Sequence, residues 1–171
     1  MVDQWHTLLN PDGKAINNAH IHGITNADVA QAPLFRDIYT EFAARLDGMV
    51  LMAHNAPFDS KMLAAEVDRI TPPGTPDDAV FFGFVDTIAL AKQLVDAPSN
   101  KLSSLLELVG LANPNAHVAI ADATATGMLF NKLLDGNAAQ LGRQILDQAQ
   151  FFNAAHAQCW QHPQRPPLPR R

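Results

Sequence analysis

Long hydrophobic runs, paired cysteines and an excess of basic residues are all missing from this sequence. No apolar stretch approaches the ~20 residues that a helix needs to cross a bilayer, so a membrane protein is not expected. The first residues, MVDQWHTLLNP, carry neither the basic segment nor the apolar run of a secretory signal peptide. A single cysteine, Cys159, cannot form a disulfide framework, and we therefore expect a reducing, cytoplasmic location.

The net negative charge of the chain limits the classes of function that the sequence allows. The formal net charge is −5, whereas a protein that coats nucleic acid non-specifically has a basic footprint. An enzyme that holds nucleic acid through divalent metal ions remains possible, because such ions take acidic ligands. The 171 residues, 47% of them hydrophobic, fit one globular domain with a sizeable core.

Strand and helix patterns alternate along the chain, which indicates the α/β class. Residues 2–9 mix Val, Trp, Thr and Leu and end at the turn signal NPDG, and we expect a strand there. Residues 49–54, MVLMAH, and 80–86, VFFGFVD, are short continuous apolar runs, typical of strands buried on both faces. Residues 15–33 have no clean period and predict an ordered loop with one helical turn.

Helical periodicity occupies most of the remaining sequence. Apolar residues recur on one helical face after Pro33, and Gly48 stands where that helix should stop. Further helices are expected over residues 57–70, 87–95, 100–111, 118–134 and 137–155. We assign residues 1–155 to one domain and 156–171 to an extended, mobile Pro/Arg-rich tail.

Two acidic residues and a histidine carry the most specific chemistry. Asp59 falls in the first turn of its helix, where it could simply complement the helix dipole, an effect of about 0.3–1 kcal/mol. His117 and Asp122 are five residues apart and would not share one face of an ideal helix. The pair makes sense if His117 precedes the helix and reaches a site that Asp122 also lines, as a general base beside an activated water would.

Five segments, taken in order and with their spacing, resemble the DEDDh 3′–5′ exonucleases. This RNase H-like family includes the proofreading epsilon subunit of bacterial DNA polymerase III. The segments are HGIT (22–25), AHNAPFD (53–59), VDT (85–87), KLSSLLELVGL (101–111) and HVAIADATAT (117–126). The resemblance extends to about residue 135. It implies an RNase H-like α/β fold and a metal-dependent 3′–5′ exonuclease that uses Mg²⁺ or Mn²⁺ in a two-metal site.

The resemblance also implies roles for individual residues and for partners. Asp122 matches the direct metal ligand, Asp59 a carboxylate that acts on the metals mostly through water, and His117 the general base. His22, Asn55 and Phe58 match residues that lie close to the terminal nucleotide of the bound strand. The implied partners are a nucleic-acid 3′ end, DNA more than RNA, and a polymerase subunit, in proofreading or repair.

Simpler structural roles exist for these three substrate-side residues. His22 precedes a glycine and could cap a turn, and Phe58 could pack in the core against the following helix. Asn55 is an expected N-cap in either case, with Pro57 in the first helical turn. His20 is interpreted as a surface residue.

One expected motif is missing. The family carries an Asp-x-Glu pair on its first strand, and none precedes HGIT, so we expect the first two strands of the mixed sheet to be absent. Two divalent ions about 3.5–4 Å apart need fixed carboxylates. Asp59 and Asp122 alone should hold at most one ion weakly, and the isolated chain should cleave poorly or not at all. Residues 49–54 would then leave an apolar edge, which predicts a strand-exchanged homo-oligomer or poor solubility.

Two alternatives concern the whole chain and its C-terminus. The chain could be a non-catalytic module that binds nucleic acid or a polymerase, although a base beside two acids favours an enzyme. His156, Cys159 and His162 are three residues apart, but three ligands without a fourth make a zinc site a weak prediction. RPPLPRR could be a polyproline ligand, and a basic tail is the preferred interpretation.

Overall fold

Two short parallel strands, β1 (Leu51–Ala53) and β2 (Phe84–Asp86), lie side by side in the computed structural model. The structure describes residues 4–47, 49–71, 84–138, 141–143, 145, 147 and 148. In the strand register Leu51 faces Phe84 and Ala53 faces Asp86. Both strands therefore end at the same edge, where loops and helix starts can converge on a site.

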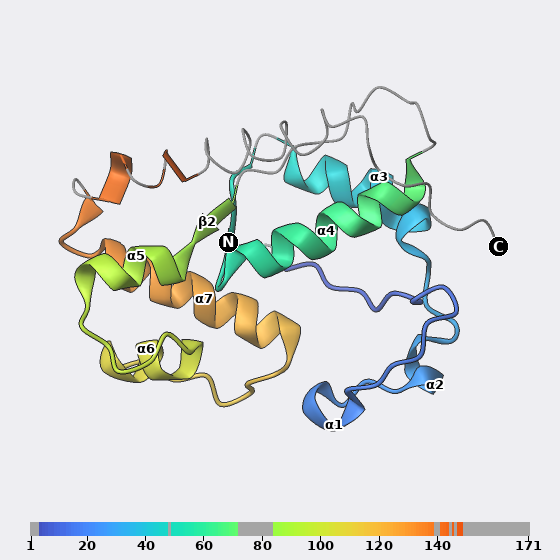
Figure 1. Cartoon of the computed structure of the whole chain (residues 1–171), viewed down its shortest axis with the longest axis horizontal. Coiled ribbons are helices and arrows are strands. Elements are labelled where there is room, and N and C mark those ends of the chain that lie inside the picture. Colours follow the sequence, from blue (N-terminus) through green and yellow to red (C-terminus); the bar gives the residue numbers. More distant parts are fainter. Residues whose placement is uncertain are drawn as a thin grey trace, which may run out of the picture.

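Helices cover both faces of this small sheet. Side chains alternate along a strand, so Leu51 and Ala53 pack with Phe84 in one cluster, whereas Met52 packs with Val85 in another. The first cluster includes side chains of α3 (Phe35–Leu46) and α4 (Ala56–Ile70). The second is built largely from α5 (Thr87–Leu94), α6 (Leu102–Leu108) and α7 (Ala119–Leu134). In Figure 1, β2 lies between these two groups of helices.

The helices predicted between residues 33 and 134 are confirmed to within a few residues at each end, because their signals are local. Asp86 caps α5 by accepting a hydrogen bond from the N–H of Ile88. Gly110, at a φ of 75°, adopts the left-handed conformation that ends the segment of α6. The loop over 15–33 contains two single turns, α1 (Ala19–His22) and α2 (Asn26–Val29), where one was expected. The second begins at a capping box between Thr25 and Asp28.

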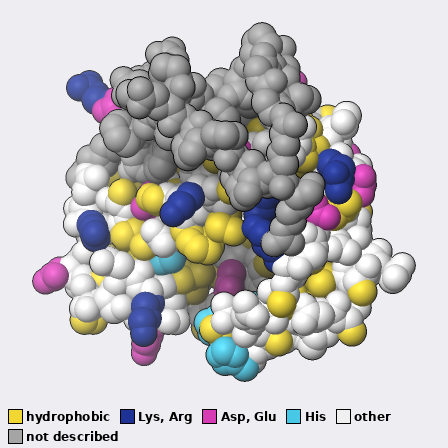
Figure 2. Space-filling view, turned by 45° about the vertical axis from the view of Figure 1, so that its right-hand side comes forward, with side chains coloured by type: hydrophobic (Ala, Val, Ile, Leu, Met, Phe, Trp, Pro, Cys, Tyr) yellow, Lys and Arg dark blue, Asp and Glu magenta, His cyan; other side chains and the backbone are white. Residues whose placement is uncertain are grey.

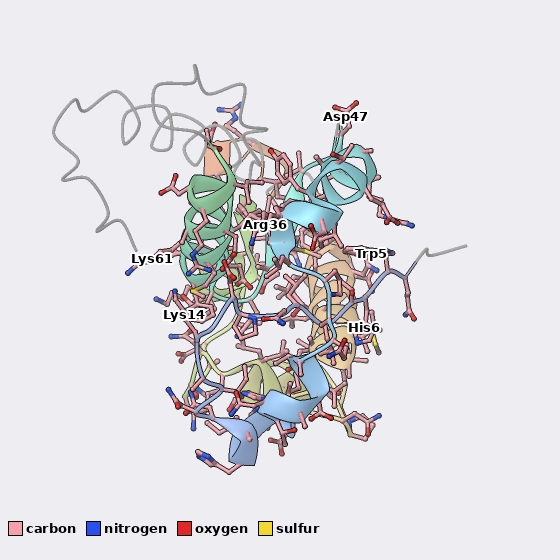
Figure 3. The ribbon with its side chains drawn as sticks, turned by 90° about the vertical axis from the view of Figure 1, so that its right-hand side faces the viewer. Trp5, His6, Lys14, Arg36, Asp47 and Lys61 are labelled. Atoms are coloured by element: carbon pink, nitrogen blue, oxygen red, sulfur yellow. The ribbon has the colours of Figure 1, made fainter. Side chains whose placement is uncertain are left out.

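The strand predicted over residues 2–9 is not formed at the described positions 4–9. A strand needs a neighbouring backbone to pair with, and the described sheet contains only β1 and β2. Side chains hold this segment instead: the Trp5 ring lies 6.2 Å from the Phe42 ring, and the Arg45 guanidinium lies 5.3 Å from the Trp5 centroid. Figure 3 shows Trp5 beneath α3.

The prediction that residues 49–54 are buried on both faces is also wrong. The strand is shorter, its three residues are half-buried, and Met49 and Val50 before it are 60% and 58% exposed. Helices cover both faces, but among the described residues β1 pairs with β2 alone. Its other edge therefore lacks the ladder partner that a buried strand has on each side.

Several predictions fall partly or wholly outside the described residues. These are residues 80–83 of the second buried run, the tail 156–171, and the candidate zinc ligands His156, Cys159 and His162. Within the helix predicted over 137–155, the described positions 138, 141–143, 145, 147 and 148 are helical. No helix in the described part of the chain has the length and apolar character that a bilayer crossing requires.

Candidate active site

A cavity of about 600 Å³ opens beside the end of β1. The end of β1, the first turn of α4, the start of α6 and the loop that leads into α7 all contribute to its wall. The polar side chains of the wall are those of His54, Asp59, Lys101, Ser103, Asn113, His117, Asp122 and Thr126. Figure 2 shows a hollow in the surface with an acidic side chain inside it and histidine side chains near its rim.

Asp122 is held firmly in the first turn of α7. Its Oδ1 accepts a hydrogen bond from Asn113 Nδ2 at 2.7 Å, and its Oδ2 accepts one from the backbone N–H of His117 at 3.1 Å. These contacts fix the plane of the carboxylate toward its own loop. Each oxygen has a further lone pair, so the carboxylate can still accept from water or bind a cation.

His117 precedes α7, as its spacing from Asp122 required. Its backbone has a φ of 71°, a left-handed conformation that is uncommon for a residue other than glycine. The hydrogen bond from its N–H to Asp122 helps to maintain this conformation. The residue is exposed and lines the cavity, so its ring is accessible to a ligand there.

Asp59 approaches the same cavity from the first turn of α4. Partial burial in the wall is the main reason that its pKa is raised above 3.8, and the neighbouring negative charge of Asp86 adds to the increase. Its own backbone N–H and nearby His54 oppose this pKa shift. A carboxylate in such surroundings is stabilised by an added cation, which would lower its pKa.

Asp86 and His54 organise the site, and the sequence interpretation gave neither of them a role. Asp86 Oδ1 accepts from the N–H of Asn55 at 3.1 Å and from that of Ile88 at 3.0 Å, so it ties the start of α4 to the start of α5. The signal for this role is an aspartate directly before a predicted helix. Its contact with Asn55 joins residues 31 positions apart, and the sequence around Asp86 could not predict it.

His54 joins three segments through its ring. Nε2 lies 2.8 Å from the Asn100 carbonyl oxygen and donates to it, because a carbonyl can only accept. Nδ1 lies 2.9 Å from Thr87 Oγ1 and shares a second hydrogen bond with that hydroxyl. The ring thereby fixes the end of β1 against α5 and against the loop before α6. The one sequence signal for a role of His54 at the site was its position directly before Asn55, a predicted site residue.

His22, Asn55 and Phe58, which are predicted to lie close to the terminal nucleotide, are not among the residues that line the cavity. His22 Nδ1 accepts from the N–H of Ile24 at 3.1 Å, the turn-capping role considered as the alternative. Asn55 precedes α4 with a φ of 71°, and its side chain makes no capping hydrogen bond. Phe58 is 61% exposed, which excludes the alternative of core packing. Their roles toward a nucleotide stay predictions.

The cavity wall offers oxygen donors of the kind that a hard divalent cation binds. Mg²⁺ commonly binds through one or two carboxylates and completes its shell with water and substrate phosphate. Asp59 and Asp122 supply two carboxylates from different elements. Within the described ranges, no three acidic, histidine or cysteine side chains gather closely enough to form a metal-binding group. The described residues therefore form no preformed site for one ion or for two, and a bound ion would take its remaining ligands from water and substrate.

Comparison with known proteins supports the exonuclease resemblance. The family model described as Exonuclease (RNase T) matches residues 2–130. The DNA polymerase III subunit epsilon of Haemophilus influenzae is 30% identical over 137 residues, which cover 78% of this chain and 53% of that protein. The subunit from Buchnera aphidicola (strain APS) is 27% identical over 138 residues, 78% of this chain and 57% of that protein.

A third relative is a much longer protein. The DNA polymerase III PolC-type protein of Thermotoga petrophila is 29% identical over 136 residues, which cover 79% of this chain but 10% of that protein. The chain thus spans little more than half of the epsilon subunits and a tenth of the PolC-type protein. The shared part contains the segments that form the cavity.

Proposed function

Because this chain belongs to the RNase T exonuclease family, we propose that it is a metal-dependent 3′–5′ exonuclease that acts on nucleic acid. The substrate we propose is DNA rather than RNA, in proofreading or repair. The observation that carries the proposal is that Asp59, at the start of α4, and the His117–Asp122 pair, at the start of α7, line one cavity although they are about 60 residues apart in the sequence. A structural role for each residue alone would not require this convergence.

The proposed division of labour follows from each residue's surroundings. His117 has an exposed ring at the cavity and would take the proton from the attacking water at a ring nitrogen. Asp122 and Asp59 would hold a divalent ion, which supplies positive charge for the phosphate and acidifies a water when it is bound. The exposed ring of Phe58 would stack on the terminal base or sugar, with His22 and Asn55 close by.

A slow reaction is expected from the isolated chain. Two carboxylates can hold one ion when water and substrate complete its shell, and the described residues form no preformed metal site. The proposed association with a polymerase subunit rests on the names of the relatives, DNA polymerase III epsilon and PolC-type.

The test is a digestion of single-stranded DNA labelled at its 5′ end, in Mg²⁺ or Mn²⁺. We expect slow shortening by single nucleotides from the 3′ end, abolished by chelation and by H117A or D122N. Lys92→Met, on the exposed side of α5, is the control and should leave the rate unchanged. Shortening that survives H117A and D122N, or cleavage only from the 5′ end, would contradict the proposal.

One observation favours a second candidate, a non-catalytic module that binds nucleic acid or a polymerase. Both oxygens of Asp122 are already hydrogen-bonded within its own loop, a contact that a purely structural residue would make. This candidate predicts oligonucleotide binding without cleavage in either metal. It also predicts that D122N unfolds the loop and lowers stability, rather than removing a reaction.

A further inference from the structure

Lys101 is a cavity residue to which neither the sequence motifs nor the relatives assign a role. It lies directly before α6, is exposed, and shares the cavity wall with Asp59, His117 and Asp122. Among the described residues its ammonium group makes no ion pair. The charges that act on Asp59 come from Asp86 and His54 rather than from Lys101. The lysine is therefore available to a ligand.

Three hydrogen bonds hold the backbone at and before Lys101. The N–H of Lys101 donates to Ser99 Oγ at 3.2 Å, and its carbonyl accepts the first helical bond, from the N–H of Leu105 at 3.1 Å. The preceding carbonyl, of Asn100, accepts from His54 Nε2 at 2.8 Å. The His54 ring, which anchors the end of β1, therefore also fixes the backbone directly before Lys101. A fixed Cα lowers the backbone entropy that is lost when the side chain binds a ligand.

The negative charge of the cavity opposes the binding of nucleic acid unless a positive group offsets it. Its acidic side chains, Asp59 and Asp122, repel a polyanion, and the whole chain carries a net charge of −5. Lys101 is the one lysine or arginine among the described residues that line the wall. An ammonium group is a compact point charge that binds phosphate oxygens. We propose that Lys101 binds a backbone phosphate of the strand in the cavity, an inference that rests on the proposed function.

The experiment measures binding of a fluorescent single-stranded oligonucleotide to the full chain by anisotropy, across a salt series and with chelator present to stop cleavage. Each neutralised phosphate contributes about 0.7 to the slope of log affinity against log salt for single strands. Lys101→Met should lower this slope by about 0.7 and weaken binding about fivefold at low salt. Lys101→Arg should restore both, and Lys92→Met, an exposed lysine away from the cavity, should change neither.

The outcomes separate this inference from the proposed function. If the wild type binds and K101M has the same slope as K92M, the Lys101 contact is wrong while the exonuclease proposal stands. If the wild type binds no oligonucleotide at any salt concentration, the Lys101 contact is wrong, and the digestion of labelled DNA decides the exonuclease proposal separately. A lowered slope in K101M that K101R restores supports the contact, provided that circular dichroism shows all variants folded.

Discussion

Asp59 and Asp28 are both first-turn aspartates, yet their surroundings move their pKa values in opposite directions. Partial burial raises the pKa of Asp59, and the hydroxyl and N–H of Thr25 lower that of Asp28. Both residues stand at helix starts, so position in the helix does not explain the difference. The cavity wall explains the difference, because it removes water from Asp59 and the opposing influence of His54 does not offset this loss.

This contrast gives a prediction with a definite sign. The folded protein binds the Asp59 proton more tightly than the unfolded chain, so Asp59 makes stability fall as pH rises from 3.8 through its folded pKa. Asp59→Asn should therefore raise the free energy of unfolding at pH 7, by less than about 1 kcal/mol because solvent screens a part-exposed carboxylate. Urea unfolding of wild type and variant at pH 7 and near pH 3.5 measures this difference in the free energy of unfolding. The difference should vanish at the lower pH, where Asp59 is largely protonated in both states.

Asp28→Asn is the matched control with the opposite sign. A lowered pKa stabilises the folded protein above the usual value of 3.8, and that stability is lost as pH falls through the lower, folded value. The variant should therefore be less stable than wild type at pH 7. If both variants shift stability in the same direction, the electrostatic description of Asp59 is wrong.

At the scale of elements, helices follow local signals more closely than strands do. The start of α7 was predictable from the apolar period after Val118, and the end of α6 from Gly110. The segment at 4–9 has strand-like residues but no described partner, and a partner cannot be read from the segment itself. The same limit hid His54 and Asp86 at the site, since their contacts join residues 31 to 46 positions apart.

Two glycines in helical segments test this local description. Gly127 lies inside α7, and a Cβ built there meets no atom within 4 Å, so Gly127→Ala should stabilise the protein by roughly 1 kcal/mol through helix propensity. Gly110 has equal space but a φ of 75°, so Gly110→Ala should destabilise it by a similar amount. Thermal unfolding of the G127A and G110A variants measures both changes in stability. A G110A variant more stable than wild type would contradict the left-handed conformation assigned to Gly110.

At the scale of the whole molecule, the distribution of exposed apolar residues is uneven. Met49 and Val50 lead into β1, whose second edge has no ladder partner among the described residues, and both are more than half exposed. Phe58 and Met62, at 61% and 51%, lie on α4 directly after it. Such an edge pairs readily with another chain. We propose that the chain associates with itself through this edge.

Size-exclusion chromatography with light scattering tests the association. The wild type should elute as a dimer or larger species, and Val50→Lys should shift it toward monomer, because a charge at the edge opposes pairing. Met128→Lys, at an exposed methionine on α7, is the control and should leave the elution unchanged. A wild type that stays monomeric at high concentration would contradict self-association.

The central claim is that Asp59, His117 and Asp122 form one site for a divalent ion. Titration with Mn²⁺, followed by the imidazole signals in NMR, tests it without a requirement for catalysis, because a paramagnetic ion broadens nearby nuclei. The account predicts that His117 broadens at lower Mn²⁺ concentrations than His20, which lies on α1, and that D122N removes the difference. Equal broadening of the two histidines in the wild type, or selective broadening that survives D122N, would contradict the claim.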